Sequence, residues 1–270
     1  MQFNGLASSA GRLSRPCDSF RVMKLIDFFT RRPDHAGGIH TTVAADAAAF
    51  ESARQKMVDH QIRDRGICSA RVLGAMSSVP RHLFVSSAHS LEAYADSPLP
   101  IGARQTISQP YMVAAMADAF ALAGHEKVLE VGAGSGYQAA VLSLLAREVI
   151  AVESVPSLAD AARERLARLG YTNVRIEIGD GSQGWPADAP YDAILVSAGA
   201  PSVPQPLVEQ LAEGGRLVIP VGPTEHQDLV RIVKRDGGTV RESLLACRFV
   251  PLVGRYGWRS SALCEEPSPG

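Results

Sequence analysis

The chain has 270 residues, which is enough for one large or two small domains with a sizeable core. A hydrophobic content of 46% and a charged content of 20% are typical of globular proteins, and a net charge of −1 gives no electrostatic reason to expect nucleic acid or a membrane as the main partner. No apolar run approaches the roughly 18 residues that a membrane span needs. The 4 cysteines form no C-x-x-C and the 7 histidines no H-E-x-x-H, which predicts reduced thiols in a cytoplasmic protein and no metal site.

Residues 1–45 differ in composition from the rest of the chain. They hold basic residues among Ser, Gly and Pro, with few acids. The apolar residues between Phe20 and Phe29 could form one short amphipathic helix, as in a targeting or membrane-touching segment. A secretory signal peptide needs a continuous apolar region, and none is present. We therefore expect a disordered leader.

Residues 46–124 are predicted to form a helical region, with order beginning near Ala47. We expect a helix over 50–64, ended by Gly66, with its apolar residues on one side. Ser69 can cap a second helix that stops before Pro80. A loop-rich connector should follow from Phe84 to Ile107, and then a helix from Tyr111 to Leu122 that begins through Pro110.

From Lys127 onward, strand and helix patterns alternate. We predict strands at 127–131, 148–152, 174–178, 191–197 and 215–221, and helices at 137–146, 157–169 and 205–213, the last closed by Gly214-Gly215. This alternation implies a parallel sheet covered on both faces. After Gly222, apolar runs flank Asp236-Gly237-Gly238, which is a hairpin signal. The predicted fold is a doubly wound, mainly parallel α/β sheet over 125–253 with a C-terminal antiparallel hairpin, followed by a tail over 254–270.

A glycine loop follows the first strand of this sheet. Gly132, Gly134 and Gly136 give the spacing G-x-G-x-G, and Tyr137 stands where a dinucleotide-binding fingerprint has its last glycine. Glycine allows left-handed backbone and close approach of a ligand, although a tight turn alone would also explain it. The spacing resembles the first motif of S-adenosylmethionine-dependent methyltransferases, which predicts that Gly132, Gly134, Ser135 and Gly136 contact this cofactor.

Three acidic residues fall at the ends of successive predicted strands: Glu130, Glu153 and Asp180. In open α/β sheets, ligands bind outside the carboxyl ends of the strands. Glu153 could accept both ribose hydroxyls, and Asp180 with Gly181 could meet the adenine. Any one of these acids could simply be a solvated strand end. Together with the glycine loop they predict S-adenosylmethionine as the cofactor.

The stretch from Leu99 to Met112 carries P-I-G, then T-I-S, then P-x-M. It closely resembles the signature of the protein-L-isoaspartate O-methyltransferase family. Further matches are Gln61-Ile62-Arg63, Arg65-Gly66-Ile67, Val79-Pro80-Arg81, Phe84-Val85, Ala93-Tyr94, Gly134 to Ala140, Gly179-Asp180-Gly181, Ala189 to Asp192, Gly214 to Gly222 and Phe249 to Leu252. The resemblance covers about residues 50–253. The departures are Ala133, where threonine or serine is usual, the leader, and the tail after Gly254.

The resemblance implies methyl transfer from S-adenosylmethionine to the free α-carboxylate of L-isoaspartyl residues in damaged proteins. The ester then closes to a succinimide, whose hydrolysis returns some normal aspartate. A carboxylate with a pKa near 4 is already ionised at pH 7, so orientation rather than a general base is required. Ser108 would hydrogen-bond the acceptor carboxylate, and it could also cap the helix at Tyr111.

The resemblance also implies that Pro110, Tyr111 and Met112 pack beside the methionine end of the cofactor. Gln227 is a further cofactor-contact candidate. A monomer without nucleic acid or membrane partners is expected. Two other interpretations remain open: a methyltransferase of this fold that acts on a small-molecule carboxylate, and a non-enzymatic interaction module.

Overall fold

The computed structural model describes residues 39–259, with side chains from residue 46. Contacts divide the chain after Thr42, and the unit that begins at Val43 carries the sheet. Most of the predicted leader, including Phe20–Phe29, lies outside the described residues. Helix α1 (Ile39–Lys56) begins earlier than the expected start of order near Ala47. No helix within residues 39–259 is long and apolar enough to cross a membrane.

The helical region before the sheet largely follows the prediction. Helix α1 continues as the π-helix η1 (Met57–Arg63), whose apolar side chains are buried. Helix α2 (Ala70–Ser78) begins where the Ser69 side chain accepts a hydrogen bond from the backbone N–H of Val72. Helix α3 (Pro110–Asp118) begins with the predicted proline but ends before Leu122. These helices bury apolar side chains against one another and against the sheet.

The connector between α2 and α3 contains a hairpin that the sequence did not predict. After the short 3-10 helices η2 (Arg81–Phe84) and η3 (Ser87–His89), strand β1 (Leu99–Gly102) pairs antiparallel with β2 (Gln105–Ile107). Its turn places Gly102, Ala103 and Arg104 in succession at positive φ (95°, 47° and 59°). For Ala103 and Arg104 this left-handed backbone is strained.

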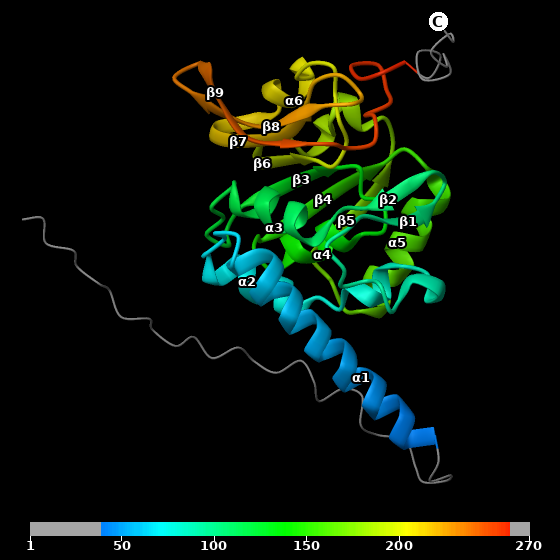
Figure 1. The fold of residues 1–270 in the computed structure, drawn as a ribbon. Coiled ribbons are helices and arrows are strands. Elements are labelled where there is room, and N and C mark those ends of the chain that lie inside the picture. Colours follow the sequence, from blue (N-terminus) through cyan, green and yellow to red (C-terminus); the bar gives the residue numbers. More distant parts are fainter. Residues whose placement is uncertain (1–38, 260–270) are drawn as a thin grey trace, which may run out of the picture. The chain divides into compact units, whose positions relative to one another are not determined.

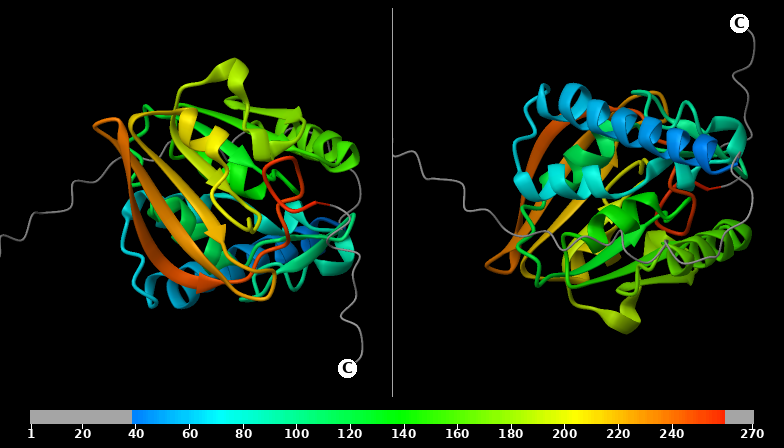
Figure 2. Two further views of the ribbon diagram at one scale, coloured as in Figure 1. Left: turned by 90° about the horizontal axis from the view of Figure 1, so that it is seen from above. Right: turned by 90° about the horizontal axis from the view of Figure 1, so that it is seen from below.

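The main sheet has seven strands in the order β5-β4-β3-β6-β7-β8-β9 (Figure 1). Its parallel strands are β3 (Lys127–Val131), β4 (Glu148–Glu153), β5 (Val174–Ile178), β6 (Tyr191–Val196) and β7 (Leu211–Val221). Strands β8 (Gln227–Arg235) and β9 (Gly238–Cys247) run antiparallel and extend from one edge as a hairpin (Figure 2). The predicted doubly wound sheet with a C-terminal hairpin is confirmed. Its chain order reverses between β3 and β6, which is where such sheets bind ligands.

The prediction of a helix over 205–213 is wrong in its second half. Helix α6 spans only Gln205–Glu209, and β7 already begins at Leu211. The pairing of β6 with β7 shifts register between Leu211 and Arg216, so the intervening residues form a bulge. A Cβ on Gly215 would lie 2.8 Å from the carbonyl oxygen of Ala212. Gly215 therefore fits a close backbone approach within a strand, and Gly214 supplies a positive φ of 76° beside it.

Two apolar clusters cover the two faces of the sheet. Side chains alternate along each strand, so Val128 and Ala151 face one cluster while Leu129 and Val152 face the other. The first cluster includes side chains of α2, α3, α4 (Tyr137–Ser143) and α5 (Pro156–Arg168). The second is closed by Leu207 of α6, near the 3-10 helices η4 (Gly181–Gln183) and η5 (Pro186–Asp188). Burial of both faces holds the central strands in register.

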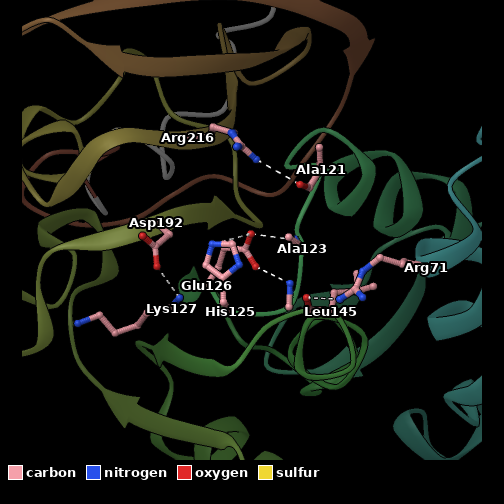
Figure 3. A network of polar contacts seen from close by, with 10 residues as sticks. Arg71, Ala121, Ala123, His125, Glu126, Lys127, Leu145, Asp192 and Arg216 are labelled. Carbon is pink, nitrogen blue, oxygen red and sulfur yellow. Dashed lines mark hydrogen bonds and ion pairs between the residues drawn. The ribbon is translucent and has the colours of Figure 1, made fainter.

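The turn that leads into β3 is fixed by polar contacts at the amino end of the sheet (Figure 3). The Glu126 carboxylate accepts hydrogen bonds from the backbone N–H groups of Ala123 (2.8 Å) and Gly124 (2.7 Å). The Asp192 carboxylate accepts from the N–H of Lys127 at 2.8 Å. These contacts fix the start of the central strand, so its carboxyl end is positioned for the glycine loop.

Candidate active site

A cavity lies at the carboxyl ends of the parallel strands and encloses about 830 Å³, including solvent at its mouth. Its walls come from the glycine loop after β3, the end of β4, the turn after β5 and the residues after β6. Residues 105–108 of the β1–β2 hairpin and its exit, and residues 250–253 beyond β9, complete it. Of the thirteen residues proposed from sequence, seven line this cavity: Ser108, Glu130, Gly132, Gly134, Ser135, Glu153 and Gly181.

The glycine loop has the backbone that its sequence requires. Gly132, Gly134 and Gly136 have φ values of 88°, 52° and 83°, which glycine adopts without strain. A Cβ on Gly134 would lie 3.2 Å from Cδ1 of Ile101, and one on Gly136 would lie 3.2 Å from Cδ1 of Leu166. Gly136 is also the N-cap of α4 and does not line the cavity. The loop is therefore packed from behind and open toward the cavity.

Glu153 joins this loop to the end of β4. Its Oε2 accepts a hydrogen bond from the backbone N–H of Gly134 at 2.8 Å, and its Oε1 accepts from the N–H of Val155 at 2.9 Å. The side chain is buried and lines the cavity. Two backbone N–H groups from different turns therefore converge on this one carboxylate. Glu153 thus fixes the loop and presents negative charge to a ligand.

Glu130 is completely buried in β3 and also lines the cavity. Within the described residues, neither of its carboxylate oxygens has a hydrogen-bond partner. Burial, and then the nearby charge of Glu153, raise the pKa of Glu130 well above its usual value. Two acids therefore face this cavity in different environments, one hydrogen-bonded and one desolvated.

Asp180 follows β5 and does not itself line the cavity, and its expected place next to the adenine stays a prediction. Oδ1 accepts hydrogen bonds from the N–H (3.0 Å) and hydroxyl (2.6 Å) of Ser182. Oδ2 accepts from the N–H of Arg255 (2.8 Å) and the amide of Gln183 (3.2 Å). Burial alone would raise the pKa of Asp180, but these hydrogen bonds lower it. Because a carboxylate accepts about four hydrogen bonds, its capacity is already used. Its neighbour Gly181 lines the cavity instead.

The bond to Arg255 belongs to a folded C-terminal loop, residues 254–258, within the region predicted as a tail. The N–H of Gly254 donates to the carbonyl oxygen of Trp258 at 3.1 Å, and the indole N–H of Trp258 donates to the carbonyl oxygen of Gly199 at 3.1 Å. The N–H of Tyr256 donates to the Ser182 hydroxyl at 3.0 Å. This loop therefore ties residues after β9 to the turns after β5 and β6.

The remaining predicted residues lie near the cavity without lining it. Pro110, Tyr111 and Met112 form the first turn of α3, where the Arg65 guanidinium lies 3.5 Å from the centre of the Tyr111 ring. Ser108 does not cap this helix, because its N-cap is Gln109 and makes no side-chain cap. The prediction that Ser108 caps α3 is therefore wrong. Ser108 lines the cavity instead.

Gln227 does not line the cavity and is held by backbone groups in this structure, and its expected contact with the cofactor stays a prediction. Its amide nitrogen donates to the carbonyl oxygens of Pro223 (2.8 Å) and Thr224 (3.1 Å). Its amide oxygen accepts from the N–H of Phe249 at 2.7 Å. The side chain is buried and all its polar atoms are bonded to backbone. Gln227 therefore holds the loop before β8 to the segment after β9.

Several wall residues were not predicted from sequence. They are Gln105, Thr106, Ile107, Val113, Val131, Ala133, Tyr137, Gln138, Val152, Ser154, Ser197, Ala198 and Val250–Val253. Gln138 directly follows the glycine loop, so its position was a usable signal. For Val250–Val253 the only signal in the sequence was the resemblance to the family motif. No local sequence pattern indicates that a segment after the hairpin packs beside β6. Ala133, where the family usually has threonine or serine, is buried in the loop.

A doubly wound sheet with this glycine loop, and with acids at the ends of β3 and β4 facing one cavity, defines an S-adenosylmethionine-dependent methyltransferase. The chain belongs to the protein-L-isoaspartate(D-aspartate) O-methyltransferase family, whose model matches residues 52–257. This membership covers both the sheet and the helical region before it.

Individual relatives agree with the family. The protein-L-isoaspartate O-methyltransferase of Methanoculleus marisnigri is 55% identical over 206 residues, covering 76% of this chain and 94% of its own. A second enzyme of that name, from Geotalea uraniireducens, is 59% identical over 210 residues, covering 77% and 97%.

Two solved structures share the fold. One protein-L-isoaspartate O-methyltransferase has a TM-score of 0.69 at 31% identity, covering 76% of this chain and 67% of its own. A Plasmodium falciparum protein assigned to the same enzyme class, in complex with S-adenosyl-L-homocysteine, has a TM-score of 0.64 at 27% identity, covering 73% and 96%.

Proposed function

We propose that this chain transfers the methyl group of S-adenosylmethionine to the free α-carboxylate of L-isoaspartyl residues in damaged proteins, and so initiates repair through a succinimide. One observation carries the proposal. The Thr106-Ile107-Ser108 stretch, which carries the family signature, and the glycine loop line the same cavity. An acceptor group held by the first would therefore lie beside a cofactor held by the second.

The acidic side chains in the cavity walls complement the positively charged groups of this cofactor. Glu130 and Glu153 line the cavity, and no Lys, Arg or His within residues 39–259 does. Such a site suits a ligand that carries a sulfonium and an ammonium group. We assign Gly132, Gly134 and Ser135 to the cofactor's backbone contacts, Glu153 to the ribose and Glu130 to the methionine end. Gly181 would contact the adenine, with Asp180 acting through it as a positioning residue.

The acceptor carboxylate needs alignment rather than activation. At pH 7 it is ionised, so no general base is required. The bound cofactor supplies an electrophilic methyl group on its sulfonium sulfur. Residues of the hairpin exit would hold the acceptor so that one carboxylate oxygen faces that methyl group, and the sulfur would leave with the electron pair of its bond to the methyl carbon. Ser108 would donate a hydrogen bond to the carboxylate, while Val250 and Leu252 exclude water.

The acceptor is tested by comparing an isoaspartyl peptide with its normal aspartyl twin and with small carboxylic acids. We expect methyl transfer to the isoaspartyl peptide and none to the aspartyl twin, because only the former carries a free α-carboxylate on a kinked backbone. Transfer to small acids alone would instead establish a small-molecule methyltransferase. Cofactor binding without any transfer would favour an interaction module.

We further propose a monomer that works in the cytoplasm without nucleic acid. The net charge of −1 supports the absence of a nucleic-acid partner, and free thiols at Cys68 and Cys247 fit a reducing compartment. Light scattering of the purified full chain tests the oligomeric state. A mass of twice the 28.7 kDa chain would contradict the monomer.

A further inference from the structure

The charge of the cavity raises a problem that its assigned residues leave unsolved. Among the described residues, Glu130 and Glu153 are the carboxyl groups that line it, and no cationic side chain does. Yet both ligands of the proposed reaction bring a carboxylate, one at the amino-acid end of the cofactor and one on the acceptor. A carboxylate in this acidic cavity needs a hydrogen-bond donor, and only neutral groups are present to supply it.

Gln138 has such a donor. It is the second residue of α4, it lines the cavity, and it is 7% exposed. Its amide nitrogen is buried and has no hydrogen-bond partner within the described residues. Buried polar atoms are normally paired, so an unpaired amide in a ligand cavity points to a missing partner.

The other buried glutamines of the described chain provide a comparison. The Gln210 amide nitrogen donates to the carbonyl oxygen of Gln183 at 2.7 Å, and its oxygen accepts from the N–H of Trp185 at 2.8 Å. Gln227 is likewise fully bonded to backbone. Both hold loops together. Gln138 is the buried glutamine whose amide nitrogen bonds to no part of the described fold and which faces the cavity.

We propose that the side-chain amide nitrogen of Gln138 donates a hydrogen bond to a ligand carboxylate in this cavity. The inference rests on the proposed function, which brings two such carboxylates to the site. An amide suits this place because a lysine or arginine would be drawn to Glu130 and Glu153 and neutralise them. Gln138 therefore lets one cavity bind a carboxylate while it stays acidic toward the cationic groups of the cofactor.

The test uses Gln138→Ala and Gln138→Glu in the full chain, with Ser143→Ala as the matched control. Ser143 is a buried polar residue of the same helix, but its hydroxyl donates to the carbonyl oxygen of Ala140 at 2.8 Å and it does not line the cavity. Calorimetry would measure the binding of S-adenosylhomocysteine and of methylthioadenosine, which lacks the amino-acid carboxylate. Steady-state rates would give KM for the isoaspartyl peptide, and melting curves would check folding.

If the partner is the cofactor's carboxylate, Gln138→Ala weakens S-adenosylhomocysteine about tenfold, leaves methylthioadenosine unchanged, and Gln138→Glu weakens binding further. If the partner is the acceptor's carboxylate, cofactor binding is unchanged and KM for the peptide rises about tenfold. Either pattern, with Ser143→Ala behaving as wild type, supports the proposal. The two patterns distinguish the source of the carboxylate.

Three results would overturn it: changes below twofold in both measurements for a folded Gln138→Ala protein, equal losses for the two nucleosides, or tighter binding by Gln138→Glu than by Gln138→Ala. The last result would mean that the amide oxygen accepts from a cation. The calorimetric arm does not depend on turnover. Failure of the wild-type protein to methylate the peptide would therefore contradict the proposed function and leave the carboxylate contact to be judged by binding.

Discussion

Glu130 shows how a single residue connects stability to the site. A carboxyl group that is fully buried with neither oxygen hydrogen-bonded is costly to ionise, by several kcal/mol in typical proteins. The raised pKa of Glu130 follows first from this burial and then from the charge of Glu153. The folded protein consequently binds a proton at this position more tightly than the unfolded chain does.

The first prediction follows from this linkage. Because the folded pKa lies above the unfolded value, the contribution of Glu130 is fully present below the unfolded pKa and is lost as the pH rises through the folded pKa. A glutamine side chain is neutral at every pH, so the ligand-free Glu130→Gln protein should lose less melting temperature between pH 5 and pH 8 than wild type. Thermal melts across this range check it, with exposed Glu51→Gln as the control. Parallel pH profiles for Glu130→Gln and wild type would refute the assignment.

The second prediction concerns Ser108. Its hydroxyl is expected to bond the acceptor carboxylate, and a hydrogen bond to a charged group contributes about 1.5–3 kcal/mol. Ser108→Ala should therefore lower kcat/KM by about tenfold to a hundredfold, while affinity for S-adenosylhomocysteine stays within about twofold. Steady-state rates and calorimetry measure the two quantities. Unchanged turnover would remove Ser108 from the reaction.

Site residues whose position follows from the local sequence pattern could be predicted. Residues whose side chains form hydrogen bonds to distant segments could not. The glycine spacing placed Gly132 and Gly134 on the cavity, and strand ends placed Glu130 and Glu153 there. Asp180 obeyed the same strand-end rule, yet its oxygens bond to Ser182 and to the N–H of Arg255, far along the chain. No residue near Asp180 in the sequence indicates that Arg255 would be its hydrogen-bond partner.

At the scale of elements, long regular segments were predictable and short irregular ones were not. Alternating strands and helices gave the parallel sheet because the central strands β3, β4 and β6 are nearly all buried and mostly apolar. The β1–β2 hairpin was missed because its strands have only 4 and 3 residues and contain Pro100 and Gly102. The sequence at the start of β7 has a helical pattern. Its pairing with β6, with a bulge between Leu211 and Arg216, determines that it is a strand.

The third prediction tests the C-terminal loop as an element of the site. A Cβ on Gly254 would lie 2.0 Å from Oδ1 of Asp180, so Gly254→Ala must displace the loop or the turn that holds Gly181. We expect weaker binding of S-adenosylhomocysteine, by about tenfold or more. Gly238→Ala is the control, since its Cβ would approach no atom closer than 3.7 Å. Calorimetry that finds equal affinities for both variants would show that the loop does not position the cofactor site.

At the scale of the whole molecule, we expect the activity not to require the residues before the described chain. The family model matches from residue 52 onward, and the side chains of Asp46 to Ala49 are exposed on α1. The apolar packing of α1 begins near Phe50, whose ring stacks on His82 with centroids 4.1 Å apart. Phe50 therefore packs this part of α1 against the residues that follow α2.

The fourth prediction is that a chain beginning near Ala47 folds and keeps full activity, because it retains Phe50 and every wall of the cavity. Melting temperatures and isoaspartyl methylation of the full and shortened chains provide the comparison. Starting instead at Glu51 would remove the stacking ring and should lower the melting temperature. A fall of many degrees for the Ala47 chain would show that earlier residues belong to the fold.

The wall at Val250–Val253 has a consequence for how the enzyme is made. All strands of the sheet and most of both apolar clusters precede residue 248, so a ribosome has produced nearly the whole core before the last cavity residues emerge. The cavity lacks one side until Leu252 reaches Gly199 and the Trp258 indole bonds beside it. A chain that stops early would hide its apolar surface yet hold no cofactor. We therefore expect premature termination between residue 248 and Trp258, after β9 is complete, to yield compact, inert protein rather than a weakened enzyme.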